Sequence, residues 1–237
     1  MHLSGATRIR VLIIIVCIVI FWLLFKQFLE NRALEVDEIV IKPSGAPVVV
    51  GVYYEALCPD SKHFVVKQLK TTHDAAPQLI DIDFIPYGKA TTEVRPDGSL
   101  EFNCQHGQVE CEANIIHACV VDVISDSDLR LKMVTCMIRD NIEPKNAFHR
   151  CAKENSIDSA DKIQKCYSGP HGAELLKTHG EKTHALRPRM DFVPTVTLDG
   201  GQYKQALILK NLLKEVCKIV AGRGPVPDVC AGESLTD

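Results

Sequence analysis

The chain has 237 residues, 46% of them hydrophobic, which is enough for one domain with a hydrophobic core and an appendage. Its formal net charge of −3 and the lack of a Lys/Arg-rich stripe give no reason to expect nucleic acid as a partner. The informative count is ten cysteines, because so many thiols indicate either metal binding in a reducing compartment or disulfides in an oxidising one.

An apolar N-terminal segment indicates which compartment applies. Residues 11–25 carry no charge and follow Arg8 and Arg10, a pattern that fits either a cleaved secretory signal peptide or an uncleaved signal anchor. No convincing small-x-small cleavage site follows, so we favour a signal anchor with a cytoplasmic N-terminus, as in a single-pass type II membrane protein. Either alternative places the body in the secretory or endolysosomal lumen. The expected boundaries are 1–10 for the cytoplasmic N-terminus, 11–29 for the signal anchor or signal peptide, and 30–46 for a stalk or linker.

Two apolar runs predict the first strands of the body. Residues 48–54, VVVGVYY, are β-branched and aromatic as in a buried strand, and residues 79–86 alternate apolar and acidic side chains. Between them, Pro59 suits the first position of a helix, and apolar residues at helical spacing follow it. A turn at 96–98 and a short strand at 100–102 come next.

The rest of the chain is mainly helical. From Glu110 to about residue 186, apolar residues recur at steps of three to four, which predicts a block of helices. A strand at 192–198, a tight turn at 199–201 and an amphipathic helix over 204–220 follow. This order of elements is that of a thioredoxin-like α/β domain. We expect that domain to cover 47–237, with a disulfide-stapled helical insertion at about 104–186.

Cys58 is the best candidate for a nucleophile, since it lies between a predicted strand and a predicted helix. Unpaired N–H groups and the positive end of the helix dipole stabilise a thiolate at such a position, and the thiolate is the attacking form. The alternative is a buried structural cysteine. With Cys58 set aside as the nucleophile and Cys17 in the apolar N-terminal segment, eight of the ten cysteines remain, and we expect Cys217 to pair with Cys230. The candidates for structural disulfides are Cys104, Cys111, Cys119, Cys136, Cys151, Cys166, Cys217 and Cys230.

The most distinctive pattern in the chain runs from Cys104 to Cys119. It reads CQHGQVECEANIIHAC and matches C-Q-H-G-x2-E-C-x2-N-x4-C at all eight fixed positions. In this signature the chain resembles the gamma-interferon-inducible lysosomal thiol reductase family, and the resemblance covers about residues 47–225. It implies a thioredoxin-like fold and the reduction of protein disulfides.

The resemblance also implies an active site of the type Cys-x-x-Cys, in which the second cysteine resolves the mixed disulfide that the first one forms. Here the run is Cys58-Pro59-Asp60-Ser61, so Ser61 replaces the resolving cysteine. We therefore expect a monothiol mechanism, with an external thiol such as glutathione or cysteine as reductant and no bound cofactor. By the same resemblance, Pro194 is expected to be cis, to face Cys58 and to help bind an extended peptide substrate.

Two alternatives concern the signature segment. Zinc could join Cys104, Cys111 and Cys119 to nearby histidines. Structural zinc sites, however, usually have cysteine pairs about two to four residues apart. These cysteines have six and seven residues between them, so we favour disulfides and expect no metal site. His106 and Glu110 fit either acid–base catalysis or hydrogen bonds that hold the loop, and we favour the second.

Two functional hypotheses follow from these observations. The first is a thiol–disulfide oxidoreductase that reduces disulfide-bonded proteins or peptides through Cys58 and contacts the membrane through its N-terminal helix. The second is a non-catalytic binding module, or a trap that holds substrates in mixed disulfides, with the same fold. A disulfide reduction assay distinguishes them.

Overall fold

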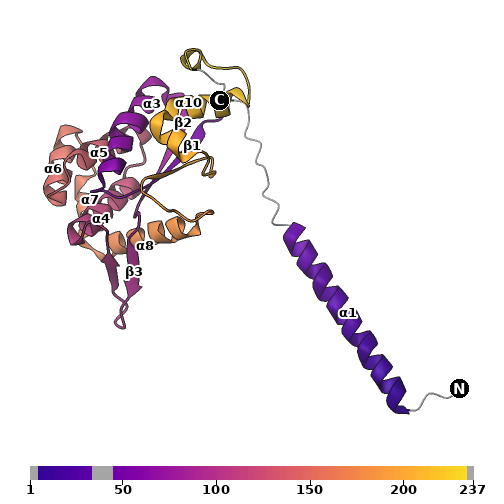
Figure 1. Ribbon diagram of the computed structural model, residues 1–237. Helices are drawn as coiled ribbons and strands as arrows, with labels where there is room; N and C mark the ends of the chain where they lie inside the picture. Colours follow the sequence, from indigo (N-terminus) through magenta and orange to yellow (C-terminus); the bar gives the residue numbers. More distant parts are fainter. Residues whose placement is uncertain (1–4, 34–44, 234–237) are drawn as a thin grey trace. The chain divides into compact units, whose positions relative to one another are not determined.

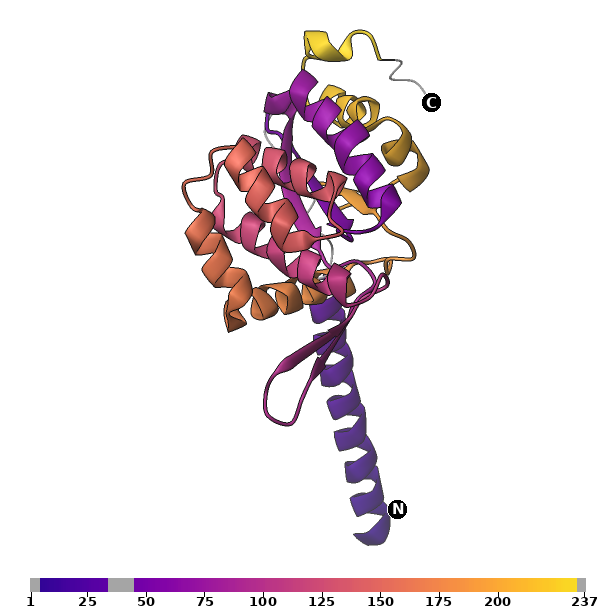
Figure 2. The same ribbon diagram turned by 90° about the vertical axis from the view of Figure 1, so that its left-hand side faces the viewer.

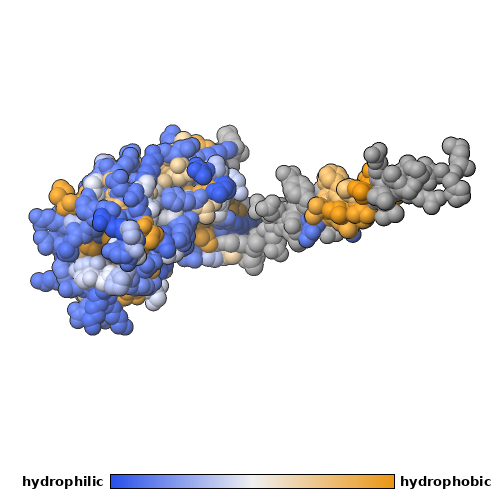
Figure 3. All heavy atoms as spheres, turned by 90° about the horizontal axis from the view of Figure 1, so that it is seen from below, coloured by the Kyte–Doolittle hydropathy of each residue, from blue (hydrophilic) through white to orange (hydrophobic). Residues whose placement is uncertain are grey.

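The computed structural model describes residues 5–33 and 45–233, and the chain divides into two compact units, Met1–Lys42 and Pro43–Asp237. The first unit contains helix α1, Gly5–Ala33. Its described side chains, 13–27, are mostly apolar and exposed (Figure 3). Within the described residues, no helix combines the length and the apolarity needed to cross a lipid bilayer. The expectation of a signal anchor over 11–29 therefore gains no support here, and most of the expected stalk over 30–46 lies outside the described residues.

A three-stranded sheet forms the centre of the second unit (Figure 1). The strands are β1 (Val48–Tyr54), β2 (Ile80–Pro86) and β5 (Thr195–Leu198), in the order β2-β1-β5. β1 is parallel to β2 and antiparallel to β5. The middle strand β1 is buried along most of its length, because α10 packs on it and α4 and α8 pack on its neighbour β2. This explains its continuous apolar sequence.

A helix that begins after Cys58 connects the two parallel strands. It runs through α2 (Pro59–His63), the π-helical segment η1 (Phe64–Leu69) and α3 (Lys70–Ala75), and the short 3-10 helix η2 (Pro77–Leu79) leads into β2. Phe64, Val65 and Leu69 are buried in the main core, as the helical spacing predicted. The strand–helix–strand unit thus places Cys58 at the carboxyl end of β1.

A hairpin and a block of helices separate β2 from β5. The hairpin consists of β3 (Thr91–Val94) and β4 (Leu100–Asn103), and it projects from the body in Figures 1 and 2. The helices are α4 (Gln108–Val123), α5 (Ser127–Arg139), α6 (Pro144–Glu154), α7 (Ala160–Ser168) and α8 (Pro170–Ala185). α4 contacts each of the other four, so it is the central helix of the block.

The C-terminal region differs from the prediction of one helix over 204–220. It contains two helices, α9 (Gln205–Lys210) and α10 (Leu212–Ala221), followed by the short 3-10 helix η3 (Asp228–Cys230). The break falls at Asn211, whose backbone leaves the helical region with φ −151° and ψ 87°. The Asn211 side chain then caps α10 by accepting a hydrogen bond from the N–H of Lys214, 3.0 Å away.

Eight cysteines form four disulfides, and the expected pair Cys217–Cys230 is among them. The four bonds are Cys104–Cys111, Cys119–Cys166, Cys136–Cys151 and Cys217–Cys230. Two of them link α4 to α7 and α5 to α6, which staples the helical block. The sheet, the helix after Cys58, the C-terminal α10 and these disulfides together confirm the predicted thioredoxin-like α/β fold.

Candidate active site

Cys58 and Cys17 are the two cysteines outside the disulfides. Cys58 is the N-cap residue of α2, with an extended backbone (φ −67°, ψ 125°), and Pro59 follows as the first helical residue. The Cys58 carbonyl accepts the first helical hydrogen bond from the N–H of Lys62 at 3.0 Å. The residue is 8% exposed, so solvent reaches only a small part of it. The predicted helix-start position of the thiol is confirmed.

The loop before β5 lies beside this thiol. The Cys58 Sγ is 3.9 Å from the Val193 carbonyl oxygen, within reach of a weak S–H hydrogen bond. The bond between Val193 and Pro194 is cis, as the resemblance implied. The hydroxyl of Thr195 donates to the Phe192 carbonyl at 2.7 Å and holds the other end of the loop. The structure thus brings Cys58 and the segment at Pro194 together, although they are far apart in the sequence.

Ser61 lies in the first turn of α2 and is fully buried. Its Oγ accepts a hydrogen bond from the backbone N–H of Glu55 at 3.3 Å. The hydroxyl therefore holds the segment before Cys58 and helps to fix the loop between β1 and α2. A sulfur at this position would be in the place of the second cysteine of a Cys-x-x-Cys motif, which this chain lacks.

The residue two positions before the thiol, Ala56, is held on both sides by side-chain amides. Its N–H donates to Asn114 Oδ1 at 2.9 Å, and its carbonyl accepts from Asn141 Nδ2 at 3.4 Å. All three residues are buried. Because Asn114 belongs to the signature and lies on α4, the signature directly positions the loop that carries Cys58.

A second contact from α4 reaches the end of β1. The hydroxyl of Tyr54 is 2.8 Å from His117 Nδ1, and His117 Nε2 is 3.2 Å from the amide nitrogen of Asn141. An amide nitrogen can only donate, so Nε2 accepts and Nδ1 carries the proton of the neutral ring. Burial lowers the pKa of His117 to about 3 and raises that of Tyr54 well above its ordinary value. Both groups are therefore neutral and serve as structural hydrogen-bonding partners.

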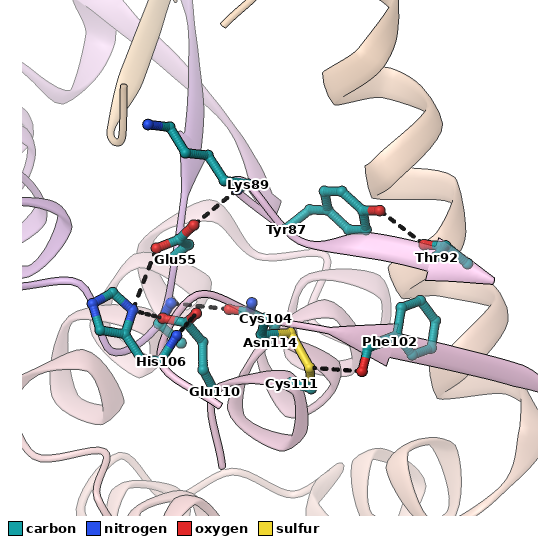
Figure 4. Close-up of a disulfide and its surroundings, with 11 residues drawn as sticks. Glu55, Tyr87, Lys89, Thr92, Phe102, Cys104, His106, Glu110, Cys111 and Asn114 are labelled. Carbon is teal, nitrogen blue, oxygen red and sulfur yellow. Dashed lines mark hydrogen bonds and ion pairs between the residues drawn. A yellow bond between two sulfur atoms is a disulfide. The ribbon is translucent and has the colours of Figure 1, made fainter. Parts of the chain in front are cut away.

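A third group of signature contacts surrounds Glu55 (Figure 4). His106 Nδ1 is 2.6 Å from Glu110 Oε2 and 3.5 Å from Glu55 Oε2, and the His106 backbone N–H donates to Glu110 Oε1 at 3.0 Å. These contacts confirm that His106 and Glu110 hold the signature loop by hydrogen bonds. Burial and then the nearby Glu110 carboxylate raise the pKa of Glu55, while a hydrogen bond from the Lys89 backbone and the positive potential of His106 oppose this shift.

The turn after β2 closes over the Glu55 side chain. Gly88 has a φ of +62°, and a Cβ atom built there would lie 2.1 Å from Glu55 Cγ, so only glycine fits. The next residue, Lys89, donates its backbone N–H to Glu55 Oε1 at 2.8 Å. Glu55 is thus held by the turn at Gly88 on one side and faces the signature loop on the other.

Sequence reasoning missed several residues of this site. Glu55, Asn141 and the packing role of Gly88 were not singled out, and Asn114 and His117 were treated only as part of a pattern. One signal was present for the last two, because they are polar side chains three residues apart among apolar neighbours on one helix. A buried polar group needs a partner. The partner of Asn114 is Ala56 in the loop before Cys58, and the partners of His117 are Tyr54 and Asn141.

Comparison with known proteins gives a consistent result. Residues 49–155 match the gamma interferon inducible lysosomal thiol reductase (GILT) family. The gamma-interferon-inducible lysosomal thiol reductase of Mus musculus is 32% identical over 190 residues, which cover 80% of this chain and 74% of that protein. A gamma-interferon-inducible lysosomal thiol reductase-like protein of Anopheles gambiae is 35% identical over 196 residues, or 77% of this chain and 80% of that protein.

Solved structures support the fold. BdbD from Bacillus subtilis, in its oxidised form, superposes with a TM-score of 0.55 at 13% identity, covering 75% of this chain and 89% of that one. MdbA of Actinomyces oris, described as a thiol-disulfide oxidoreductase, gives a TM-score of 0.52 at 12% identity, with coverages of 77% and 83%. At this level of identity, the likeness concerns the architecture of the chain.

Proposed function

This chain belongs to the gamma interferon inducible lysosomal thiol reductase family, and from that premise we propose that it is a thiol–disulfide oxidoreductase that acts through Cys58. One observation carries the proposal. An unpaired cysteine stands at the N-cap of a helix, with its sulfur 3.9 Å from the carbonyl that precedes a cis proline. The helix start stabilises the thiolate, and the neighbouring loop offers backbone groups to an extended substrate.

The proposed reaction has three thiol–disulfide exchanges. In the first, the Cys58 thiolate attacks one sulfur of a substrate disulfide, forms a mixed disulfide with it and releases the other sulfur as a thiolate. In the second, an external thiolate attacks the substrate sulfur of this mixed disulfide and displaces the Cys58 thiolate. A further equivalent of external thiol then reduces the substrate–thiol disulfide. Two external thiols are thus oxidised to one disulfide for each substrate disulfide reduced.

An external thiol is needed because Ser61 has no sulfur with which to resolve the mixed disulfide. Glutathione and cysteine are the reductants that we propose, and no bound cofactor takes part in this scheme. The substrates would be disulfide-bonded proteins or peptides. We propose that the segment at Val193 and Pro194 pairs with the substrate backbone next to the cysteine under attack, since its carbonyl lies beside the Cys58 sulfur.

We propose the lumen of the secretory or endolysosomal system as the location. Four disulfides in one domain require an oxidising compartment during folding, and the named mouse relative is a lysosomal protein. Attachment to the membrane by residues 11–29, with type II topology, stays a prediction. N-terminal sequencing of the mature protein tests it, because a first residue beyond 25 would mean cleavage in place of anchoring.

The function is tested by the glutathione-dependent reduction of a fluorescent disulfide-bonded peptide, with the Cys58→Ala variant as control. We expect the unchanged chain to turn over more substrate than the variant, which should match the rate of glutathione alone. The Ser61→Cys variant should reduce substrate faster, because a resolving thiol one helical turn after Cys58 replaces the slow bimolecular step.

Two results would contradict this assignment in different ways. Equal rates for the unchanged chain and Cys58→Ala would exclude turnover. Mass spectrometry would then show whether Cys58 still forms a stable mixed disulfide with the peptide, as a trap would. If Cys58 forms no adduct, the remaining hypothesis is a non-catalytic binding module.

A further inference from the structure

Three potential metal ligands converge from separate parts of the chain near the signature loop (Figure 4). Glu55 follows β1, His106 lies in the loop after β4, and Glu110 is in the first turn of α4. One donor atom from each lies within 4.8 Å of the other two. Both carboxylate side chains are buried, with 1% and 0% of their surface exposed, while the imidazole is 40% exposed.

One of these donor atoms lacks a hydrogen bond. Glu55 Oε2 is buried and has no hydrogen-bond partner, although it points toward the His106 ring at 3.5 Å. A buried carboxylate oxygen without a donor is costly, and such an atom calls for an explanation. The other oxygen of this carboxylate, Glu55 Oε1, accepts a hydrogen bond from the Lys89 backbone N–H. The unsatisfied atom is therefore the one that faces the cluster.

The other contacts arrange the cluster as an outer shell arranges metal ligands. Each carboxylate has one oxygen bound to a backbone N–H, from Lys89 for Glu55 and from His106 for Glu110. This leaves the second oxygen of each facing the same imidazole nitrogen. Fixed outer-shell donors of this kind orient ligands and increase metal affinity. The disulfide Cys104–Cys111 closes the loop that carries His106 and so limits its movement.

From this geometry we propose that Glu55, His106 and Glu110 bind one divalent cation, and that Zn²⁺ is the ion whose preferences fit the site. A mixed set of imidazole and carboxylate ligands suits Zn²⁺ better than Ca²⁺ or Mg²⁺, which prefer oxygen ligands alone. A +2 ion also compensates two carboxylates that are buried side by side. Water would complete the coordination on the exposed side of the imidazole.

One of the two separations from His106 Nδ1 already agrees with this assignment. Around a tetrahedral Zn²⁺ ion with bonds of about 2.0–2.2 Å, neighbouring ligand atoms lie about 3.3–3.6 Å apart. The separation of His106 Nδ1 and Glu55 Oε2, 3.5 Å, already matches. The 2.6 Å between His106 Nδ1 and Glu110 Oε2 is the length of a hydrogen bond. Binding of the ion would therefore require that Nδ1 carries no proton, with the ring proton on Nε2, and that these two atoms move apart.

The site goes beyond the proposed redox function and can be tested apart from it. Isothermal titration with Zn²⁺ should use the full-length chain with Cys17→Ser and Cys58→Ser, so that no free thiol binds the metal. We expect one ion per chain. Glu55→Gln or His106→Ala should each weaken binding by at least about tenfold. The exposed residues Glu93 and His149 provide matched controls, and Glu93→Gln and His149→Ala should leave the affinity unchanged.

X-ray absorption on the zinc-loaded chain provides a second measurement that needs no ligand variant. We expect one imidazole nitrogen, oxygen ligands and no sulfur. The absence of saturable binding, an unchanged affinity in folded His106→Ala, or a shell with sulfur would each overturn the proposal. Circular dichroism identifies variants that fail to fold. Because the titrated variant already carries Cys58→Ser, the zinc result does not depend on reductase activity.

Discussion

Cys58 and Ser61 are one helical turn apart, but their side chains have different tasks. The Cys58 sulfur faces the carbonyl before Pro194, while the Ser61 hydroxyl accepts from the backbone of Glu55. Serine at position 61 offers no sulfur for a second exchange, and its hydroxyl accepts a hydrogen bond from the loop before Cys58. Under the proposed mechanism, Cys58 stays in position as the nucleophile and its turnover depends on an external thiol.

Asn114 provides a prediction at the scale of a single residue. Its Oδ1 is the acceptor for the buried N–H of Ala56. The change Asn114→Ala leaves that donor without a partner, which should lower the free energy of unfolding by about 1–3 kcal/mol. Urea denaturation followed by circular dichroism measures the loss.

Asn146 provides the control for this prediction, because it is exposed and its side-chain amide donates to the exposed Glu143 carboxylate. Asn146→Ala should change the free energy of unfolding by less than about 0.5 kcal/mol. If Asn114→Ala were as mild as Asn146→Ala, then Asn114 would not hold the loop before Cys58.

The elements that the sequence predicted well are those with a strong local pattern. The β-branched run gave β1 with its observed bounds, Val48–Tyr54, and the cysteine before a proline gave the start of α2. The sequence did not predict the break between α9 and α10 at Asn211, because the apolar spacing of a helix continues on both sides of it. Strand β3, Thr91–Val94, is mostly exposed and pairs only with β4, so it has no apolar alternation to reveal it.

The site was predictable to a smaller extent. Cys58 carries a local signal, and Pro194 came from family resemblance alone. The partners of Ala56 and Tyr54, and His106 beside Glu55, lie about 50 to 85 residues away, and only the fold brings them together. Local spacing contains no information about such contacts, which is why Asn141 was not expected.

The disulfides allow a prediction at the scale of elements. Cys119–Cys166 links α4 to α7 over a separation of 47 residues, and Cys217–Cys230 links α10 to η3 over 13. Loop-closure entropy predicts losses of about 4 kcal/mol and about 3 kcal/mol when the two bonds are removed by paired Cys→Ala changes. Urea denaturation without reductant measures both in the same background.

The comparison between the two variants is its own control, since each removes two buried sulfur atoms and one cross-link. A larger loss from the short C-terminal bond than from Cys119–Cys166 would contradict the entropic argument. Such a result would mean that packing around the sulfur atoms decides the effect.

At the scale of the whole molecule, the signature helix α4 joins the loop before Cys58 to the helical block. One face of α4 holds the residues just before Cys58, and its disulfide to α7 fixes it among the other helices. The same helix buries His117, whose ring stays neutral because burial lowers its pKa to about 3. Another buried histidine, His179 on α8, has a pKa lowered to about 4, first by burial and then by Lys182. These two buried histidines therefore make the stability of the helical block depend on pH.

The buried His117 leads to a prediction about acid stability. The unfolded chain protonates this histidine near pH 6.5, whereas the folded chain keeps it neutral down to about pH 3. The unfolded state therefore binds more protons in this window, and His117 makes the fold less stable as the pH falls, by about 2 kcal/mol between pH 7 and pH 5. In His117→Gln, which keeps polar atoms near Tyr54 and Asn141, the free energy of unfolding should fall by about 2 kcal/mol less over the same range.

Urea denaturation at both pH values measures this, with the exposed His149→Gln as a control whose pH dependence should equal that of the unchanged chain. An unaltered pH dependence in His117→Gln would show that the ring is protonated inside the fold at pH 5. In an acidic lumen, neutral buried histidines would oppose folding, and the cross-links on α4 and its neighbours would offset that loss.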